Sequence, residues 1–201
     1  VHPIERREVV TLIDVLVGYL KAGESAAWSF KPALAHRLDA EASGLIVAAK
    51  NARALRDLTG QFRERETEKE YYAVVRGTPS SPQGRIEEPL ADRKGVLREA
   101  LTEYKVEKSG GKFSLLCVRI HTGRLHQIRR HLAGIGHPIV GDRQYGGPNA
   151  DRLYLHAWRL GKELLLISMC GETVVDYALR FKNEFGPTTW VCGYADDLVA
   201  Y

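Results

Sequence analysis

The chain has 201 residues, of which 44% are hydrophobic and 27% are charged, proportions typical of a soluble globular protein and not of a disordered one. No apolar run approaches the roughly 20 residues that a membrane-spanning helix needs, and the first residues do not resemble a secretory signal. The formal net charge of +4 gives only weak support for a polyanionic partner. We therefore expect a cytoplasmic protein that makes no membrane contact.

Two helices and a strand are expected in the first third of the chain. Thr11 and Asp14 form a T-x-x-D capping pattern followed by apolar residues at helical spacing, which predicts a helix over residues 12–20. The short apolar run at 45–49 follows a glycine and predicts a buried strand. Asn51 is suited to cap a second helix. The expected inner face of that helix consists of Leu55, Leu58 and Phe62.

Strands dominate the rest of the chain. Residues 71–75 predict a strand that ends near Gly77, the segment 92–95 predicts a polar hairpin loop, and Ser109-Gly110-Gly111 predicts a hairpin. The other expected elements are strands at 100–106, 113–120 and 164–169, and a helix after Gly123 with Leu125, Ile128, Leu132 and Ile135 on one face. We therefore expect an α+β fold, with a central mixed, mostly antiparallel sheet flanked by helices and loops, in a single domain over residues 1–201.

Several motif classes are missing from the sequence. It contains no G-x-x-x-x-G-K-[ST] phosphate loop, no G-x-G-x-x-G dinucleotide turn and no zinc deaminase signature. ATP-driven, redox and deaminase chemistry are therefore not expected, and no nucleotide cofactor is predicted. Cys117, Cys170 and Cys192 are odd in number and lack C-x-x-C spacing, so they predict neither disulfides nor a zinc site.

Three histidines follow one another at intervals of five residues, at His121, His126 and His131. Five residues turn a helix by about 500°, which is about 140° beyond a full turn, so consecutive members do not share a helix face. We therefore expect hydrogen-bonding or packing roles for these histidines, and no metal site.

Between residues 108 and 141 the chain carries six basic residues and no Asp or Glu. Such a stretch lets the phosphates of a nucleic acid approach without a repulsive neighbour. From charge alone, a solvent-exposed helix face is an equally good interpretation. The six residues are Lys108, Lys112, Arg119, Arg124, Arg129 and Arg130.

Three residues have ordinary structural interpretations when each is taken alone. Asp39 lies in a small-residue loop, where an aspartate most often forms an Asx-turn. Tyr71 begins a strand and is by default a cross-strand aromatic residue. Arg129 follows Ile128, so we expect it at the edge of the apolar helix face, where it needs an acidic partner from another segment.

Three long motifs, in order, resemble those of the RluA-type RNA pseudouridine synthases. His36-Arg37-Leu38-Asp39 with Ser43-Gly44-Leu45 resembles the catalytic motif H-R-L-D-x-x-T-S-G-L, and Lys69-x-Tyr71-x-Ala73-x-Val75-x-Gly77 is similar to the second motif. The segments 122–129 and 136–142 resemble the third, and 153–157 is similar to the late L-H-A strand. The resemblance covers roughly residues 1–160, and three such motifs rarely coincide by chance.

The resemblance implies isomerisation of uridine to pseudouridine in ribosomal or transfer RNA, a redox-neutral reaction that needs no cofactor. It implies that Asp39 is the essential carboxylate and that Arg129 is its ion-pair partner, since a guanidinium favours and orients an ionised carboxylate. Tyr71 would pack on the uracil and assist proton removal. The nucleotide must be flipped out of its helix, and Arg37 would then fill the vacated space.

Further RNA contacts are expected from the third motif and from the basic stretch. Arg124, His126 and Gln127 either orient their loop or touch RNA, two alternatives of equal weight. The expected phosphate contacts are Lys108, Lys112, Arg119 and Arg130.

The sequence departs from the family pattern at a few positions. Ala42 replaces the usual Thr, and Leu125 stands where Thr or Ser is common. Val1-His2-Pro3 is similar to the end of the family's opening motif. We therefore expect that the preceding strand is missing and that no separate N-terminal RNA-binding domain is present. We also expect a monomer. The alternatives are a catalytically inactive RNA-binding relative and a hydrolase that uses the histidines, with or without a metal.

Overall fold

The computed structural model describes residues 11–23, 30–160, 164–169 and 189–193. The chain divides into two compact units: the first contains Val1–Ala40 and Ile46–Glu66, and the second contains Glu41–Leu45 and Thr67–Tyr201. None of the described helices has the length and apolar content that a membrane crossing requires. The expectations for the opening motif, for Cys170 and for the Cys192 side chain lie outside the described residues. The expected single domain stays a prediction.

The first unit contains two helices and a short two-stranded sheet. Helix α1 (Leu12–Gly23) begins after Thr11, whose N–H donates to the Asp14 carboxylate at 3.0 Å, so the predicted capping pattern is confirmed. Helix α2 (Ala52–Arg63) begins after Asn51, whose Oδ1 accepts from the Ala54 N–H at 2.8 Å, as predicted. Strands β1 (Ala33–Leu34) and β3 (Ala48–Ala49) pair antiparallel. On α2 the residues Leu55, Leu58 and Phe62 are half-buried, as expected.

The predicted strand at 45–49 is wrong in its extent. Only Ala48–Ala49 is a strand there, and β2 (Ser43–Gly44) precedes it, while residues 45–47 belong to neither. The reason is that two units share this stretch of chain. Strand β2 pairs with a strand of the second unit, whereas β3 pairs with β1 of the first.

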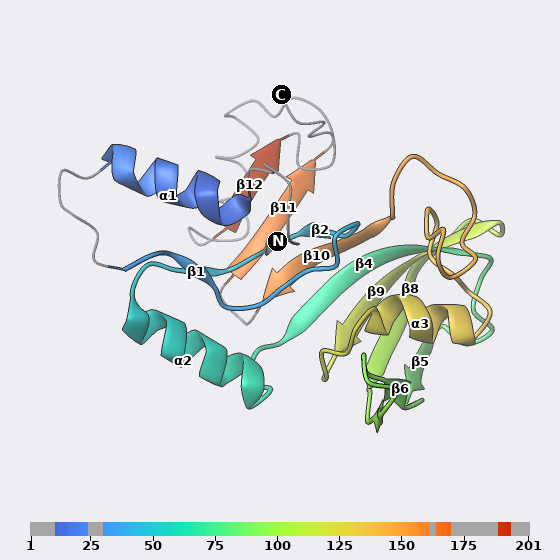
Figure 1. Cartoon of the computed structure of the whole chain (residues 1–201). Coiled ribbons are helices and arrows are strands. Elements are labelled where there is room, and N and C mark those ends of the chain that lie inside the picture. Colours follow the sequence, from blue (N-terminus) through green and yellow to red (C-terminus); the bar gives the residue numbers. More distant parts are fainter. Residues whose placement is uncertain (1–10, 24–29, 161–163, 170–188, 194–201) are drawn as a thin grey trace. The chain divides into compact units, whose positions relative to one another are not determined.

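The second unit is built on an eight-stranded sheet whose order is β12-β11-β10-β4-β9-β8-β5, with β2 paired to β10 (Figure 1). The pairs β2–β10 and β11–β12 are parallel and the others antiparallel, so the predicted mixed, mostly antiparallel sheet is confirmed. The remaining bounds are β4 (Lys69–Arg76), β5 (Gln83–Ile86), β8 (Thr102–Ser109), β9 (Phe113–Ile120), β10 (Leu155–Leu160), β11 (Leu164–Met169) and β12 (Thr189–Gly193).

Two hairpins follow the predicted turn chemistry. Strands β8 and β9 are joined at Ser109-Gly110-Gly111, where Gly111 has a φ of 73° that glycine adopts readily. Strands β6 (Leu90–Ala91) and β7 (Leu97–Arg98) form a separate pair. Their loop is closed by the Asp92 carboxylate, which accepts from the Lys94 and Val96 N–H groups at 2.9 and 3.0 Å. These bonds lower the pKa of Asp92 below its ordinary value.

Alternation along β9 separates the two faces of the sheet. Leu116 and Val118 are fully buried, whereas Leu115 and Arg119 are only half-buried. The buried face is the one that carries helix α3 (Gln127–Gly134), because Thr102 of β8 lies opposite Ile120 of β9 and hydrogen-bonds to two side chains of α3 (Figure 1). We call this the helix face and the other the open face.

Helix α3 is shorter and more deeply buried than its sequence predicts. It begins at Gln127, so Leu125 precedes it, and Ile135 follows its end and is 39% exposed. Ile128 and Leu132 pack inside, as expected, but Arg129 is only 2% exposed instead of lying at the edge of the apolar face. Its position is possible because acidic partners, described below, satisfy the guanidinium inside the fold.

Candidate active site

The segment with Arg37 and Asp39 is anchored in the first unit through His36. The His36 Nε2 accepts from the Val47 N–H at 3.0 Å, and its ring stacks on Phe62 of α2, with 4.7 Å between ring centroids and 28° between planes. Arg37 is exposed and Asp39 is half-buried. The motif histidine therefore positions the short segment that presents Arg37 and Asp39.

The residues that follow Asp39 are held by the second unit. The Glu41 carboxylate lies 3.0 Å from the Arg129 Nη2. Ser43 pairs with His156 in the backbone register of β2 and β10, and its Oγ lies 2.9 Å from the His156 Nδ1. Leu45 is buried. An ion pair, a backbone strand pairing and a side-chain hydrogen bond thus hold this segment within the second unit.

Tyr71 lies on the helix face near the same segment. It is 9% exposed and pairs with Val118 of β9, whose side chain points to the helix face. On its other side Tyr71 pairs with Ala157 of β10, and Ala157 pairs in turn with Gly44 of β2. Because neighbouring strands are about 4.8 Å apart, the backbones of Tyr71 and Gly44 are about 10 Å apart.

Arg129 is held by two acidic residues of the second unit. Its Nε and Nη2 donate to the two carboxylate oxygens of Asp142 at 2.7 and 2.8 Å, a bidentate pair in which both side chains are buried. Its Nη2 also lies 3.0 Å from Glu41, and the Tyr145 ring lies 5.2 Å from its central carbon. Asp39 belongs to the first unit, so its predicted ion pair with Arg129 stays a prediction.

The loop around Asp142 is built to hold this carboxylate. Its Oδ1 also accepts from the backbone N–H groups of Gln144 and Tyr145, both at 3.1 Å. Burial acts to raise the pKa of Asp142, but the hydrogen bonds and charge of Arg129 and these backbone donors outweigh it and hold the pKa below its ordinary value. Gly141 precedes Asp142 with a φ of 82°, and a Cβ there would lie 1.6 Å from the Arg152 carbonyl oxygen.

A chain of buried hydrogen bonds ties helix α3 to strand β8. The Gln127 Oε1 accepts from the Thr122 hydroxyl at 2.6 Å and from the Arg124 N–H at 3.0 Å. The Gln127 Nε2 donates to the Thr102 Oγ1 at 3.0 Å, and the Thr102 hydroxyl lies 2.9 Å from the His131 Nδ1. These bonds position the helix that carries Arg129. Gln127 therefore orients its loop, and its contact with RNA stays a prediction.

The other predicted RNA-binding residues have mixed surroundings. The Arg124 Nε donates to the Glu99 carbonyl at 2.8 Å, and the Arg130 Nη1 donates to the Ala91 carbonyl at 2.9 Å. His126 has a left-handed φ of 51°, and its Nδ1 lies 3.0 Å from the Tyr145 hydroxyl. Lys108 and Lys112 are exposed near the β8–β9 hairpin. RNA contact by these residues stays a prediction.

The three histidines make hydrogen bonds, as expected. His121 bonds to Glu103, His126 to Tyr145, and His131 to Thr102 and the Glu88 carbonyl. Within the described ranges, no three His, Cys, Asp or Glu side chains are grouped so that they could hold a metal ion.

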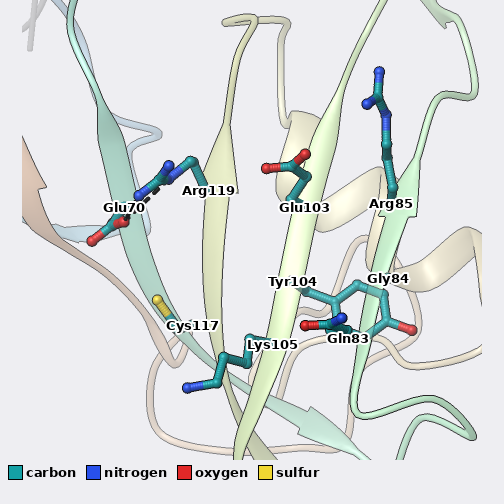
Figure 2. A pocket seen from close by; sticks show the side chains of 9 residues that line it. All are labelled: Glu70, Gln83, Gly84, Arg85, Glu103, Tyr104, Lys105, Cys117 and Arg119. Atoms are coloured by element: carbon teal, nitrogen blue, oxygen red, sulfur yellow. Dashed lines mark hydrogen bonds and ion pairs between the residues drawn. The ribbon is translucent and has the colours of Figure 1, made fainter.

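A hollow of about 560 Å³ lies on the open face of the sheet (Figure 2). Asp39, Tyr71 and Arg129 do not line it. Each of its charged lining residues contacts a residue of opposite charge or, for Glu103, a histidine. The pairs are Arg119–Glu70, Arg85–Glu87, Lys105–Glu107 and Glu103–His121. The predicted phosphate contact Arg119 is therefore already bound to a carboxylate.

Sequence reasoning missed three residues around Arg129: Glu41, Asp142 and Tyr145. Glu41 lies inside the first motif but at one of its variable positions, and Asp142 was noted only as the end of the third motif. The acid-free basic stretch was itself a signal, because it ends immediately before Asp142. A buried arginine needs a carboxylate, and this is the first acid that follows it.

Comparison with known proteins identifies the family. The family model described as RNA pseudouridylate synthase matches residues 19–134, more than half of the chain. The chain belongs to this family. The resemblance to the RluA-type enzymes is thereby confirmed.

Three relatives illustrate the match. The chain is 45% identical over 194 residues to an "Uncharacterized RNA pseudouridine synthase" of Aquifex aeolicus strain VF5, covering 90% of this chain and 58% of that protein. It is 42% identical over 137 residues to the "Dual-specificity RNA pseudouridine synthase RluA" of Escherichia coli strain K12, covering 61% and 63%. The solved structure of "Human RNA Pseudouridylate Synthase Domain Containing 1" matches with a TM-score of 0.59 and 28% identity, covering 63% and 62%. The chain thus spans less than two thirds of each relative.

Proposed function

We propose that this protein isomerises uridine to pseudouridine in RNA. The observation that carries the proposal is that the segment immediately after Asp39 pairs through β2 with β10, the neighbour of the strand that supplies Tyr71. The Glu41–Arg129 ion pair joins the same segment to the helix that supplies Arg129. Asp39 lies two residues before Glu41, and two residues of chain span at most about 7 Å. We propose that the residues of the three family motifs act on one nucleotide.

In the proposed reaction Asp39 is the essential carboxylate. The glycosidic carbon–nitrogen bond of the uridine breaks, the uracil turns while it is held, and a carbon–carbon bond forms to the same sugar. The proton displaced from the new bonding carbon of the base leaves to solvent or to a base in the site, while a ring nitrogen regains one, so the overall reaction is an isomerisation. Tyr71 packs against the uracil, because it lies on the helix face near the Asp39 segment.

The substrate nucleotide is flipped out of its helix, since a stacked uridine is out of reach of a carboxylate in a protein loop. Arg37 is exposed two residues before Asp39, where its planar guanidinium can stack in the vacated space. We propose ribosomal or transfer RNA as the substrate. The test therefore includes both RNA classes.

Tritium release from RNA labelled at carbon 5 of uridine tests this function. The wild-type protein is expected to release tritium, because this carbon loses its hydrogen in the reaction, and Asp39→Asn is expected to bind the same RNA without release. Binding of RNA by the wild-type protein without any release would favour the inactive RNA-binding relative. Loss of activity on treatment with a chelator would favour a metal-dependent hydrolase and contradict the proposal.

A further inference from the structure

The proposed reaction assigns no role to the acidic residue Glu41. It lies two residues after Asp39, its side chain is 54% exposed, and its carboxylate lies 3.0 Å from the buried Arg129. We propose that Glu41 is a positioning residue: its ion pair with Arg129 holds the loop that carries Asp39 in its working position. This inference rests on the proposed function.

Arg129 is a rigid anchor for such a contact. Its side chain is 2% exposed, and its Nε and Nη2 are bound in bidentate fashion by Asp142, which is itself fully buried. The Tyr145 ring covers one side of the guanidinium at 5.2 Å. An Nη2 atom carries two N–H groups, so it can bind Asp142 and Glu41 at the same time. The part of this contact that is free to move is therefore Glu41 and not Arg129.

The other anchors of this loop act farther from Asp39. Strand β2 consists of Ser43 and Gly44 only, and the Ser43 hydroxyl contacts His156. These contacts hold the chain from the fourth residue after Asp39 onward. Without Glu41 the intervening residues Ala40 to Ala42 have no other side chain that can form an ion pair or hydrogen bond. A displacement of about 1 Å at a reacting group can reduce the rate about 100-fold, so this contact matters for catalysis more than for stability.

Two Glu41 variants and a matched control test the proposal. Glu41→Ala is expected to lower kcat for tritium release about 10- to 100-fold while KM for RNA changes less than about threefold, since the contact acts on the loop and not on RNA binding. Glu41→Gln is expected to recover part of the loss, because its polar amide oxygen can take the place of the carboxylate oxygen beside the Arg129 guanidinium. Glu64→Ala removes another half-exposed glutamate that pairs with an arginine, and it is expected to leave kcat unchanged.

Hydrogen exchange gives a measurement that does not depend on activity. In Glu41→Ala the amides of residues 39–45 are expected to exchange faster, with no change in strands β4 and β9. An unchanged exchange rate in this segment overturns the proposal. A wild-type kcat in Glu41→Ala, a change in KM alone, or no recovery in Glu41→Gln also overturns it. If the wild-type protein modifies no RNA, the proposed function fails, and the exchange experiment still decides whether Glu41 holds the loop.

Discussion

The two faces of the sheet in the second unit each carry an arginine–carboxylate pair. On the helix face Arg129 binds Asp142, and the two side chains are 2% and 0% exposed. On the open face Arg85 binds Glu87, and the two side chains are 59% and 63% exposed. Both pairs join a guanidinium to a carboxylate. They differ in how well water can solvate the residue that remains after its partner is removed. This difference determines how much each pair contributes to the free energy of unfolding.

A buried ion pair depends on the structure around it, because water cannot replace either partner. Removal of one partner of a buried pair leaves a charge that water cannot solvate, whereas an exposed charge is solvated at once. Asp142 therefore holds Arg129 in one orientation on the helix face. We expect the exposed pair on the open face to contribute less to stability.

The largest expected effect is on the buried pair. Asp142→Ala leaves Arg129 without its bidentate partner and should lower the free energy of unfolding by about 3–5 kcal/mol. Urea denaturation, followed by circular dichroism, measures this change. A loss no larger than that in the open-face variant Arg85→Ala would show that burial does not distinguish the two pairs.

Adjacent leucines on β9 test the same distinction without charge. Leu116 is fully buried on the helix face, whereas Leu115 is half-buried on the open face. Leu116→Ala should cost about 2–5 kcal/mol of unfolding free energy, because it removes core contacts and leaves a cavity. Leu115→Ala should cost about 1 kcal/mol. If denaturant titrations show the same loss of unfolding free energy for both variants, the open face is buried to the same degree as the helix face.

The pH dependence of stability tests the buried polar network. Burial lowers the pKa of His131 below its ordinary value of 6.5, so the unfolded chain takes up the proton first as the pH falls. The contribution of His131 is therefore fully present above about pH 6.5 and is lost as the pH falls through its folded-state pKa. Between pH 7 and pH 5 the wild-type free energy of unfolding should decrease.

His131→Gln is the matched variant for this measurement. It removes the titrating ring, so its stability should depend less on pH over the same interval, although it is less stable at pH 7. Parallel curves for the two proteins would contradict the assignment of the pH dependence to His131.

The smallest expected effect is on the open face. Arg85→Ala should change the free energy of unfolding by about 0–1 kcal/mol, since exposed ion pairs such as Arg85–Glu87 contribute little. Addition of 0.5 M salt should reduce even this difference, because salt screens exposed charges. A loss of several kcal/mol would show that the Arg85–Glu87 pair stabilises the fold as much as the Arg129–Asp142 pair.

Local chemistry made much of the fold predictable. The caps at Thr11 and Asn51, the Asp92 turn and the glycine hairpin depend on neighbours within four residues, and each is present as predicted. The α+β class and the antiparallel character of the sheet followed from many strands joined by short turns. The resemblance to the family motifs identified Asp39, Tyr71 and Arg129 as candidate catalytic residues. The sequence around each residue, taken alone, indicates only a structural role.

Long-range partners could not be predicted in the same way. The run at 45–49 was expected to be one strand, but only Ala48–Ala49 is a strand there, and it pairs within the first unit, whereas the preceding Ser43–Gly44 pairs within the second. Arg129 was expected at a helix edge, yet a carboxylate 13 residues away takes it into the core. Periodicity records how apolar a face is, and it contains no information about which distant acid will neutralise a charge. The Glu41–Arg129 contact also joins residues far apart in the sequence, and the sequence did not predict it.

Nucleoside analysis of RNA incubated with this protein tests the central claim most directly. Digestion and chromatography after reaction with the wild-type protein should show one pseudouridine gained for each uridine lost and no free uracil. The same analysis with Asp39→Asn should show unchanged uridine. Release of free uracil, or an equal yield of pseudouridine with Asp39→Asn, would contradict the account.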